Sequence, residues 1–258
     1  MAGASVVVHR NPRVLAESIC ARLITRLVDV QSSGRVARWV LTGGSIADAV
    51  HRAVAASPAR DAVDWAGVEF WWGDERFLSA GHPDRNETQA WAALLEHLRV
   101  DPGRVHPMPD TDTATDDPDR AAESYAAELA AAATPEDHGD VPTFDVLMLG
   151  VGPDGHVASL FPERPALYDE RAVTAVRGSP KPPPTRVTMT MGTLQRSREV
   201  WFVASGGDKA GAVRLGLSDA GAVQVPAAGP RGLQRTLWLL DSDAAAQIPT
   251  ALTRLSSP

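Results

Sequence analysis

The feature of the sequence that most constrains its fold is an apolar run that ends in a glycine-rich turn. Residues 146–149 read VLML, and residues 150–156 continue as GVGPDGH. A short apolar run between turn residues is typical of a strand that is buried on both faces of a parallel sheet. Glycine, proline and aspartate at such density favour a tight, exposed turn. The sequence therefore predicts an α/β protein in which this turn follows a central strand.

His156 is the residue with which the chain leaves this turn. In an open α/β sheet, ligands bind just beyond the carboxyl ends of the strands. Histidine side chains titrate near neutral pH, so an imidazole at this place is suited to proton transfer. His156 is therefore the leading catalytic candidate, and the neighbouring Asp154 is the candidate that orients it.

Two other interpretations of this stretch stay open. His156 can be a structural histidine that only caps the turn. Gly150, Gly152 and Gly155 also match the pattern G-x-G-x-x-G of dinucleotide-binding loops. The second interpretation has little support, because Pro162 follows too soon for the full helix that such a loop requires.

The pattern of strand, glycine turn and helix recurs along the chain. Gly43, Gly73 and Gly206 each follow an apolar run, as Gly150 does. Units of this kind predict a doubly wound, mostly parallel sheet of the Rossmann-like type, with helices on both faces and all candidate site residues at one edge. No glycine- or serine-rich linker divides the 258 residues, so we expect one domain over residues 1–258. The predicted strands are residues 5–9, 39–41, 68–72, 105–108, 146–149, 172–176, 185–191, 200–204 and 236–240, and the predicted helices are residues 12–33, 46–55, 87–98, 121–133 and 210–217.

One of the glycine turns suits an anionic ligand. Gly43, Gly44 and Ser45 lie between a predicted strand and a predicted helix. Backbone N–H groups at a helix N-terminus bind phosphate well, because unpaired donors and the helix dipole act together. The alternative is an ordinary turn in which Ser45 is the N-cap of the helix.

Three cations are candidates for the same anion. Lys181 lies within a proline-rich segment that we expect to be a stiff, extended loop, and Arg186 follows it. Both are able to reach an anion, with Arg186 the stronger candidate. Lys209 begins a predicted helix, where the helix dipole opposes its charge, so an anion partner explains it better than a structural role.

A block of three charged residues, Asp74, Glu75 and Arg76, follows the strand predicted at residues 68–72. Such a block is usually a solvated loop. At the carboxyl end of a strand in this fold, we expect it to face the ligand crevice instead. Arg76 is able to bind substrate oxygens bidentately.

The overall charge limits the classes of partner. The formal net charge is −7. A nucleic-acid surface requires clustered positive charge, so we expect no nucleic-acid partner. A small anionic substrate is compatible with this charge only if its site concentrates basic residues against the overall field.

Membrane, disulfide and metal sites are not expected. Residues 1–10 lack the long apolar segment of a signal peptide, and no stretch is long enough to span a membrane. Cys20 is the only cysteine, which excludes an intrachain disulfide and a C-x-x-C metal site. The histidines are scattered and no H-E-x-x-H motif occurs. We therefore expect a cytoplasmic protein that needs no metal or cofactor.

The segment GVGPDGHVASLFP at residues 150–162 resembles the characteristic motif of the 6-phosphogluconolactonases, a family that acts in the oxidative pentose phosphate pathway. The related glucosamine-6-phosphate deaminases carry a similar D-G-H turn, but ASLFP at residues 158–162 is similar to the lactonases. The blocks GGS at 43–45, GDER at 73–76 and PPTRVT at 183–188 agree with the family as well. The family often continues G-G-S with Thr-Pro, where this chain has Ile-Ala.

The resemblance implies hydrolysis of 6-phosphogluconolactone to 6-phosphogluconate. His156 would activate water as general base, Asp154 would orient it, and Arg76 would stabilise the oxyanion. Asp74 is a secondary acid/base candidate, because the carboxylate at its position transfers protons in the related deaminases. The residues implied for binding the sugar phosphate are Gly43, Gly44, Ser45, Asn86, Arg186 and Lys209.

Two other functions stay open. An amino-sugar phosphate deaminase or isomerase would use the same fold, although Arg76 and the S-L-F-P segment are similar to the lactonases instead. A non-catalytic sugar-phosphate sensor would usually carry a DNA-binding module, and no basic helix-turn-helix segment is visible. An acyl-serine route is not expected, because the motif G-x-S-x-G is absent. We expect a monomer or small homo-oligomer whose partner is a small phosphorylated sugar lactone.

Overall fold

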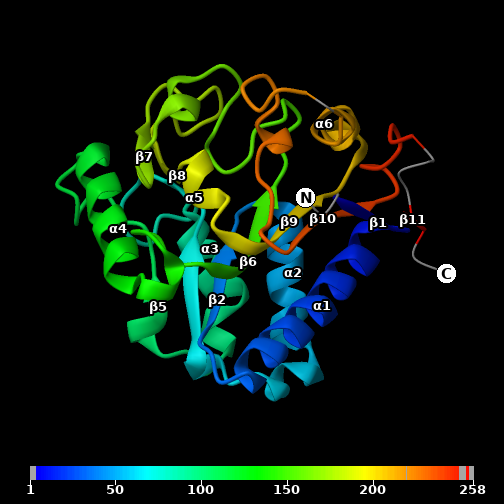
Figure 1. Ribbon diagram of the computed structural model, residues 1–258, viewed down its shortest axis with the longest axis horizontal. Coiled ribbons are helices and arrows are strands. Elements are labelled where there is room, and N and C mark those ends of the chain that lie inside the picture. Colours follow the sequence, from blue (N-terminus) through cyan, green and yellow to red (C-terminus); the bar gives the residue numbers. More distant parts are fainter. Residues whose placement is uncertain (1–3, 219, 250–253, 256–258) are drawn as a thin grey trace.

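An eight-stranded sheet forms the centre of the protein in the computed structural model, which describes residues 4–218, 220–249 and 254–255. The strand order is β11-β1-β10-β9-β6-β2-β3-β5, and all neighbouring strands are parallel. Helices lie on both faces of this sheet (Figure 1). The predicted doubly wound, mostly parallel fold is therefore confirmed.

The strands of this sheet follow the apolar runs of the sequence. The strands predicted at residues 5–9 and 68–72 have the predicted bounds, the other predicted strands of this sheet differ by one to three residues at an end, and β11 was not predicted. Parallel strands bury both faces, which is why continuous apolar runs identify them. The strands are β1 (Ser5–His9), β2 (Ala37–Leu41), β3 (Val68–Trp72), β5 (Val105–His106), β6 (Phe144–Gly150), β9 (Ser197–Ala204), β10 (Arg235–Asp241) and β11 (Arg254–Leu255).

The helices begin at capping residues and bury apolar stripes. Asn11 caps the first helix, since its side chain accepts a hydrogen bond of 2.9 Å from the N–H of Val14. The helix predicted at residues 87–98 is wrong in its second half. The backbone leaves the helical region at Leu94, and the side chain of Leu94 is buried. The α-helices are α1 (Pro12–Ser32), α2 (Ser45–Ala56), α3 (Asn86–Ala93), α4 (Pro118–Ala132), α5 (Met191–Leu194) and α6 (Ala210–Gly216), and short 3-10 helices lie at Pro58–Ala62, Trp65–Gly67, Leu95–His97, Pro102–Arg104, Pro135–Asp137, Pro165–Tyr168, Gly207–Lys209 and Pro226–Ala228.

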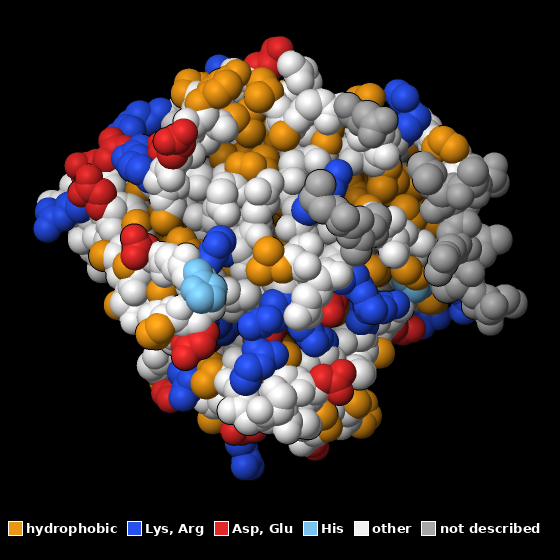
Figure 2. Space-filling view, in the orientation of Figure 1, with side chains coloured by type: hydrophobic (Ala, Val, Ile, Leu, Met, Phe, Trp, Pro, Cys, Tyr) orange, Lys and Arg blue, Asp and Glu red, His pale blue; other side chains and the backbone are white. Residues whose placement is uncertain are grey.

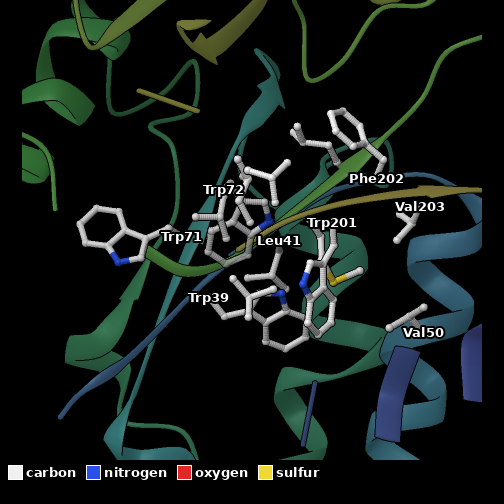
Figure 3. Close-up of a cluster of buried hydrophobic side chains, with 14 of the residues drawn as sticks. Trp39, Leu41, Val50, Trp71, Trp72, Trp201, Phe202 and Val203 are labelled. Carbon is white, nitrogen blue, oxygen red and sulfur yellow. The ribbon is translucent and has the colours of Figure 1, made fainter. Parts of the chain in front are cut away.

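Large aromatic side chains fill the core beside the sheet. Figure 3 shows Trp39 from β2, Trp72 from β3 and Trp201 from β9 together, while Trp71 from β3 points away from them, and Val50 comes from α2. All five of these side chains are fully buried. Truncating one such ring to alanine costs about 3 to 5 kcal/mol. The strands that carry the loops of the site are therefore fixed in position by this packing.

A second, smaller sheet lies beyond the carboxyl ends of the parallel strands. Its strands are β4 (Asp74–Arg76), β8 (Arg186–Met189) and β7 (Val173–Val176), in the order β4-β8-β7, and both pairs are antiparallel. The N–H of Gly73 donates to the carbonyl of Leu41 and its own carbonyl accepts from Met189, so Gly73 is the point at which the chain passes from one sheet to the other.

The prediction that all candidate site residues lie at the edge of the parallel sheet is wrong for Asp74, Arg76 and Arg186, which lie on strands of the small sheet. Arg76 and Arg186 face each other as a register pair of the antiparallel sheet. A three-residue strand is too short for its alternation to be read from the sequence, which is why β4 was expected to be a loop.

No helix within the described residues is long and apolar enough to cross a bilayer.

Candidate active site

A cavity of about 270 Å³ lies where the carboxyl ends of β2, β6 and β9 meet the small antiparallel sheet. This volume is at the small end of the range for ligand pockets. Nine of the residues expected at the site line it: Gly43, Gly44, Ser45, Asp74, Arg76, Asn86, His156, Arg186 and Lys209. The tenth, Asp154, does not line the cavity but contacts His156.

The charge of the cavity is opposite to that of the whole chain. Its described lining has four basic side chains, from Arg76, Lys181, Arg186 and Lys209, and one carboxylate, from Asp74. The formal net charge of the protein is −7. Acidic and basic side chains are interspersed on the face that Figure 2 shows. The cavity is thus a local concentration of positive charge of the kind that an anionic ligand requires.

His156 and Asp154 form a hydrogen-bonded pair. The Nδ1 atom of His156 lies 2.5 Å from Oδ1 of Asp154. Burial alone would raise the pKa of Asp154, but the hydrogen bond and charge of His156, together with Lys181, lower it to about 2. An ionised Asp154 fixes the proton of the neutral imidazole on Nδ1, which leaves Nε2 as the acceptor. The arrangement is therefore that of an oriented general base.

The turn before His156 holds this pair in place. The N–H of Gly152 donates to the carbonyl of His156 at 2.9 Å, which closes the turn. A Cβ atom on Gly152 would lie 2.0 Å from Nδ1 of His156 and 2.5 Å from Oδ1 of Asp154. Only glycine fits there, so the glycine is required by the contact between the two side chains. The imidazole packs on the ring of Phe161, with ring centroids 4.5 Å apart.

The glycine turn after β2 leads directly into α2. Gly44 is the N-cap, with a φ of 102°. Because glycine has no side chain to accept from them, the first N–H groups of the helix stay open to the cavity. Ser45 is the first helical residue, so the alternative in which Ser45 is the N-cap is wrong. A Cβ atom on Gly43 would lie 1.9 Å from Oδ1 of Asn86, which shows how closely α3 approaches this turn.

Asn86 and Asp74 are linked across the base of the cavity. The side-chain amide of Asn86 donates to the carbonyl of Asp74 at 2.9 Å. Its Oδ1 atom is buried and finds no hydrogen-bond partner among the described residues. The hydroxyl of Ser159 donates to Oδ2 of Asp74 at 2.6 Å, and Ser159 is itself fully buried. Asp74 is thus held in place by its neighbours, which makes its carboxylate less suited to transfer a proton.

Arg76 keeps one donor without a partner. Its Nη1 donates to the carbonyl of Asp84 at 2.5 Å. Its Nε is buried and has no partner among the described residues. An unpaired buried donor costs free energy unless a ligand completes it. Arg76 also lines the cavity, so its guanidinium group is placed to donate to an oxygen of the substrate.

Glu75 does not face the cavity, so the expectation that the whole charged block lies in the crevice is wrong for this residue. In a strand, successive side chains point to opposite faces, and Glu75 alternates with Asp74 and Arg76. Its carboxylate accepts hydrogen bonds from the N–H groups of Asn86 (2.7 Å) and Glu87 (2.8 Å). Burial raises the pKa of Glu75 to about 7, although Arg85 and these N–H groups lower it.

Glu75 and Ser159 are the residues that sequence analysis missed. Glu75 anchors the start of α3, and hence Asn86, while Ser159 holds Asp74. Glu75 carried no signal of its own, since it stands between the charged residues Asp74 and Arg76. Ser159 carried none beyond its place in the S-L-F-P segment.

The two lysines of the cavity have carboxylate neighbours. Nζ of Lys209 lies 3.0 Å from Oδ2 of Asp208, so Lys209 has a structural partner as well as a place in the cavity. Nζ of Lys181 lies 3.9 Å from Oδ1 of Asp154. Both side chains are partly exposed, and both line the cavity.

Comparison with known proteins identifies relatives over nearly the whole chain. The family model described as glucosamine-6-phosphate isomerases/6-phosphogluconolactonase matches residues 10–238. The 6-phosphogluconolactonase of Streptomyces coelicolor is 55% identical over 96% of this chain and 95% of its own length. That of Mycobacterium tuberculosis is 43% identical over 95% of this chain and 99% of its own length.

A solved structure agrees with these sequence matches. The 6-phosphogluconolactonase of Trypanosoma brucei superposes with a TM-score of 0.81 and 26% identity, covering 95% of this chain and 99% of that one. The parallel sheet, the cationic cavity at its carboxyl edge and these similarities lead to one conclusion. The chain belongs to the family of glucosamine-6-phosphate isomerases and 6-phosphogluconolactonases.

Proposed function

We propose that this protein hydrolyses 6-phosphogluconolactone to 6-phosphogluconate. The observation that carries this proposal is the His156–Asp154 pair, which lies at the wall of a cationic cavity with Nε2 left as the proton acceptor. The relatives that share 55% and 43% of their residues with this chain bear the name of that activity.

In the first step, Nε2 of His156 takes a proton from a water molecule as its oxygen attacks the carbonyl carbon of the lactone. A carbon–oxygen bond forms, and the carbonyl oxygen becomes an oxyanion. The charge that develops on His156 is stabilised by the ionised Asp154 at Nδ1. A positioned general base of this kind contributes about 10²- to 10⁴-fold to a rate.

The oxyanion needs a fixed donor in the cavity. The guanidinium group of Arg76 is the donor that we assign to it, because Arg76 lines the cavity and already carries positive charge. Removing one such donor from an active site costs about 10²- to 10³-fold in kcat.

In the second step, the bond between the carbonyl carbon and the ring oxygen breaks. The ring oxygen takes the proton from Nε2 of His156 and becomes a hydroxyl group, and the new carboxylic acid ionises. His156 returns to its neutral state, so the cycle consumes one water molecule and requires no other reactant. No step is assigned to a metal or cofactor.

The phosphate group of the substrate is assigned to the other end of the cavity. The N–H groups of Gly44, the N-cap of α2, and of Ser45, its first residue, supply donors together with the ammonium group of Lys209. Asn86 supports the turn at Gly43 from behind. Binding of this remote group fixes the position of the carbonyl carbon relative to His156.

Three further properties are proposed with this function. Strands from both ends of the chain lie in one sheet, which supports a single domain over residues 1–258. We propose a cytoplasmic location, since a charged sugar phosphate stays in the compartment that makes it. A monomer or small homo-oligomer with no nucleic-acid partner stays a prediction.

The function is tested with freshly generated 6-phosphogluconolactone. Its decay is followed with the protein and without it, and ammonia release from glucosamine 6-phosphate is measured with the same preparation. Faster lactone decay without ammonia release is the expected result. Ammonia release would instead support the deaminase alternative. Binding of sugar phosphates with neither reaction would support the sensor alternative.

A further inference from the structure

The loop at residues 178–184 is fastened to the small sheet by one side chain. Arg186 is only 5% exposed, and its guanidinium group turns back toward this loop. Nε donates to the carbonyl of Pro183 at 3.2 Å, and Nη2 donates to the carbonyls of Lys181 at 3.2 Å and Pro182 at 3.0 Å. Two of its three nitrogen atoms are therefore used by the loop. Nη1 is the one without a hydrogen-bond partner among the described residues.

The loop has few other means of holding its shape. Prolines occupy positions 180 and 182–184, so only the amides of Ser179 and Lys181 are able to donate near its tip. Ser179 donates to the carbonyl of Pro184 at 2.9 Å, and Lys181 donates to the hydroxyl of Ser179 at 3.2 Å. The carbonyls of three successive residues point at Arg186 instead. An arginine fork is suited to such a set of acceptors, whereas a lysine is not.

The residue that this loop presents to the cavity is Lys181. Its ammonium group lies 3.9 Å from Oδ1 of Asp154 and lines the cavity. Burial lowers the pKa of Lys181, Asp154 opposes this, and the charges of Lys209 and Arg186 lower it further. Cations from three separate segments are therefore held close together. Like charges gathered in this way destabilise a free protein and are relieved by a bound anion.

We propose that Arg186 is a positioning residue that holds the 178–184 loop, and that Lys181 is the residue of this loop that contacts the anionic phosphate of the substrate together with Lys209. The inference rests on the proposed function for the identity of the substrate. It changes the part assigned to Arg186 from the sequence, because most of its donors are turned to the loop and not to the cavity.

The proposal predicts that Arg186 and Lys181 act through one contact. The test is a cycle of Lys181→Met, Arg186→Lys and the double variant, with KM and kcat measured for the lactone. Lys181→Met is expected to raise KM about tenfold with kcat retained, as befits the loss of a charged contact made in the bound substrate. Arg186→Lys keeps the positive charge but loses the forked geometry of the guanidinium group, and it is expected to raise KM by a similar factor. The KM of the double variant is expected to be about tenfold above that of the wild type, as in each single variant.

Independent roles would give a different result. If Arg186 bound the phosphate by itself, the two increases in KM would multiply, and the double variant would have a KM about a hundredfold above that of the wild type. That result would overturn the proposal. An unchanged KM in Lys181→Met would overturn it too. Arg177→Lys is the matched control, because Arg177 directly precedes the loop but pairs with Asp119 at 2.7 Å, away from the cavity.

Two measurements do not depend on the reaction, and the first of them does not depend on the folding of the Arg186 variant either. Calorimetric titration with inorganic phosphate is expected to give about tenfold weaker binding to Lys181→Met than to the wild type, and equal binding would contradict the proposal. Hydrogen exchange at the amides of Ser179 and Lys181 is expected to be faster in Arg186→Lys than in Arg177→Lys. A wild type that binds phosphate through Lys181 but leaves the lactone intact would refute the proposed function and retain the inference.

Discussion

The two sheets supply the site in different ways. The parallel sheet supplies loops: the turn after β6 carries His156, and the turn after β2 carries the open N–H groups of α2. The antiparallel sheet supplies side chains from the strands themselves, and these are tied to neighbours. Asp74 accepts from Ser159, and Arg186 donates to the loop beside it.

This difference suggests a division of labour. Groups on the turns keep a free donor or acceptor, so they are suited to bind and to transfer protons. Apart from Arg76, which we assign to the oxyanion, groups on the small sheet have most of their hydrogen bonds completed within the protein, so they are suited to hold the others in place. Substitutions at the turns should therefore lower activity and leave stability unchanged. Substitutions in the small sheet should also change the stability of the protein and the order of the loop at residues 178–184.

The largest effect on the turn side is expected for Asp154→Asn. The amide cannot stabilise a protonated His156 and permits the wrong tautomer, so kcat should fall about 10³-fold. Asp154 is partly exposed, and the melting temperature should therefore stay within a few degrees of the wild type. Steady-state kinetics and thermal melting check the two parts. A variant with nearly normal kcat would remove Asp154 from the mechanism.

The next effect is expected for Gly152→Ala. The added methyl group would overlap His156 and Asp154 and push the imidazole away, which should cost about 10²-fold in kcat. Gly192→Ala is the matched control, because its Cβ atom would meet nothing closer than 4.0 Å. Normal activity in Gly152→Ala would show that the turn does not need this close contact.

The small-sheet side is tested through the pH dependence of stability. The pKa of Glu75 is raised by burial from 4.5 to about 7. Between these two pH values the unfolded chain releases the proton while the folded protein keeps it, so the free energy of unfolding should fall as pH rises, by about 3 kcal/mol. Glu75→Gln stays neutral and should lose this part of the dependence. Urea unfolding at pH 5 and pH 8 measures it.

Glu96→Gln provides the control for that comparison, because its side chain is largely exposed. It should keep the pH dependence of the wild type. If Glu75→Gln also kept the full dependence, Glu75 would be ionised in the folded protein at pH 5, and the description of the small sheet would need revision.

The smallest effect is expected for Ser45→Ala. Ser45 is the first residue of α2 and lies next to the N-cap, so its backbone N–H, not its hydroxyl, is the donor assigned to phosphate. KM should change by no more than about threefold, which corresponds to the loss of less than one ordinary hydrogen bond. A tenfold rise in KM would show that the hydroxyl itself binds the substrate.

The parallel sheet was predictable because its signal is local. Strands buried on both faces are continuous apolar runs, and each site turn follows such a run within a few residues. The positions of His156, Gly44 and Lys209 around one cavity follow from that rule, since the carboxyl ends of parallel strands meet at one edge.

The small sheet was not predictable because its signal is not local. Arg76 pairs with Arg186, more than a hundred positions away in the sequence, and β4 is too short to show alternation. The burial of Glu75 and the turn of Arg186 toward the loop depend on this pairing. A charged residue in sequence gives no sign of whether its donors face a ligand or the protein.

The central claim is that the turn after β6, and not the small sheet, supplies the general base. The most direct test compares progress curves for 6-phosphogluconolactone with wild type, His156→Gln, and no protein. The account predicts that the wild type accelerates decay and that His156→Gln is about 10²- to 10⁴-fold slower than the wild type. A His156→Gln variant with the rate of the wild type would contradict it and make Asp74, on the small sheet, the next candidate for the base.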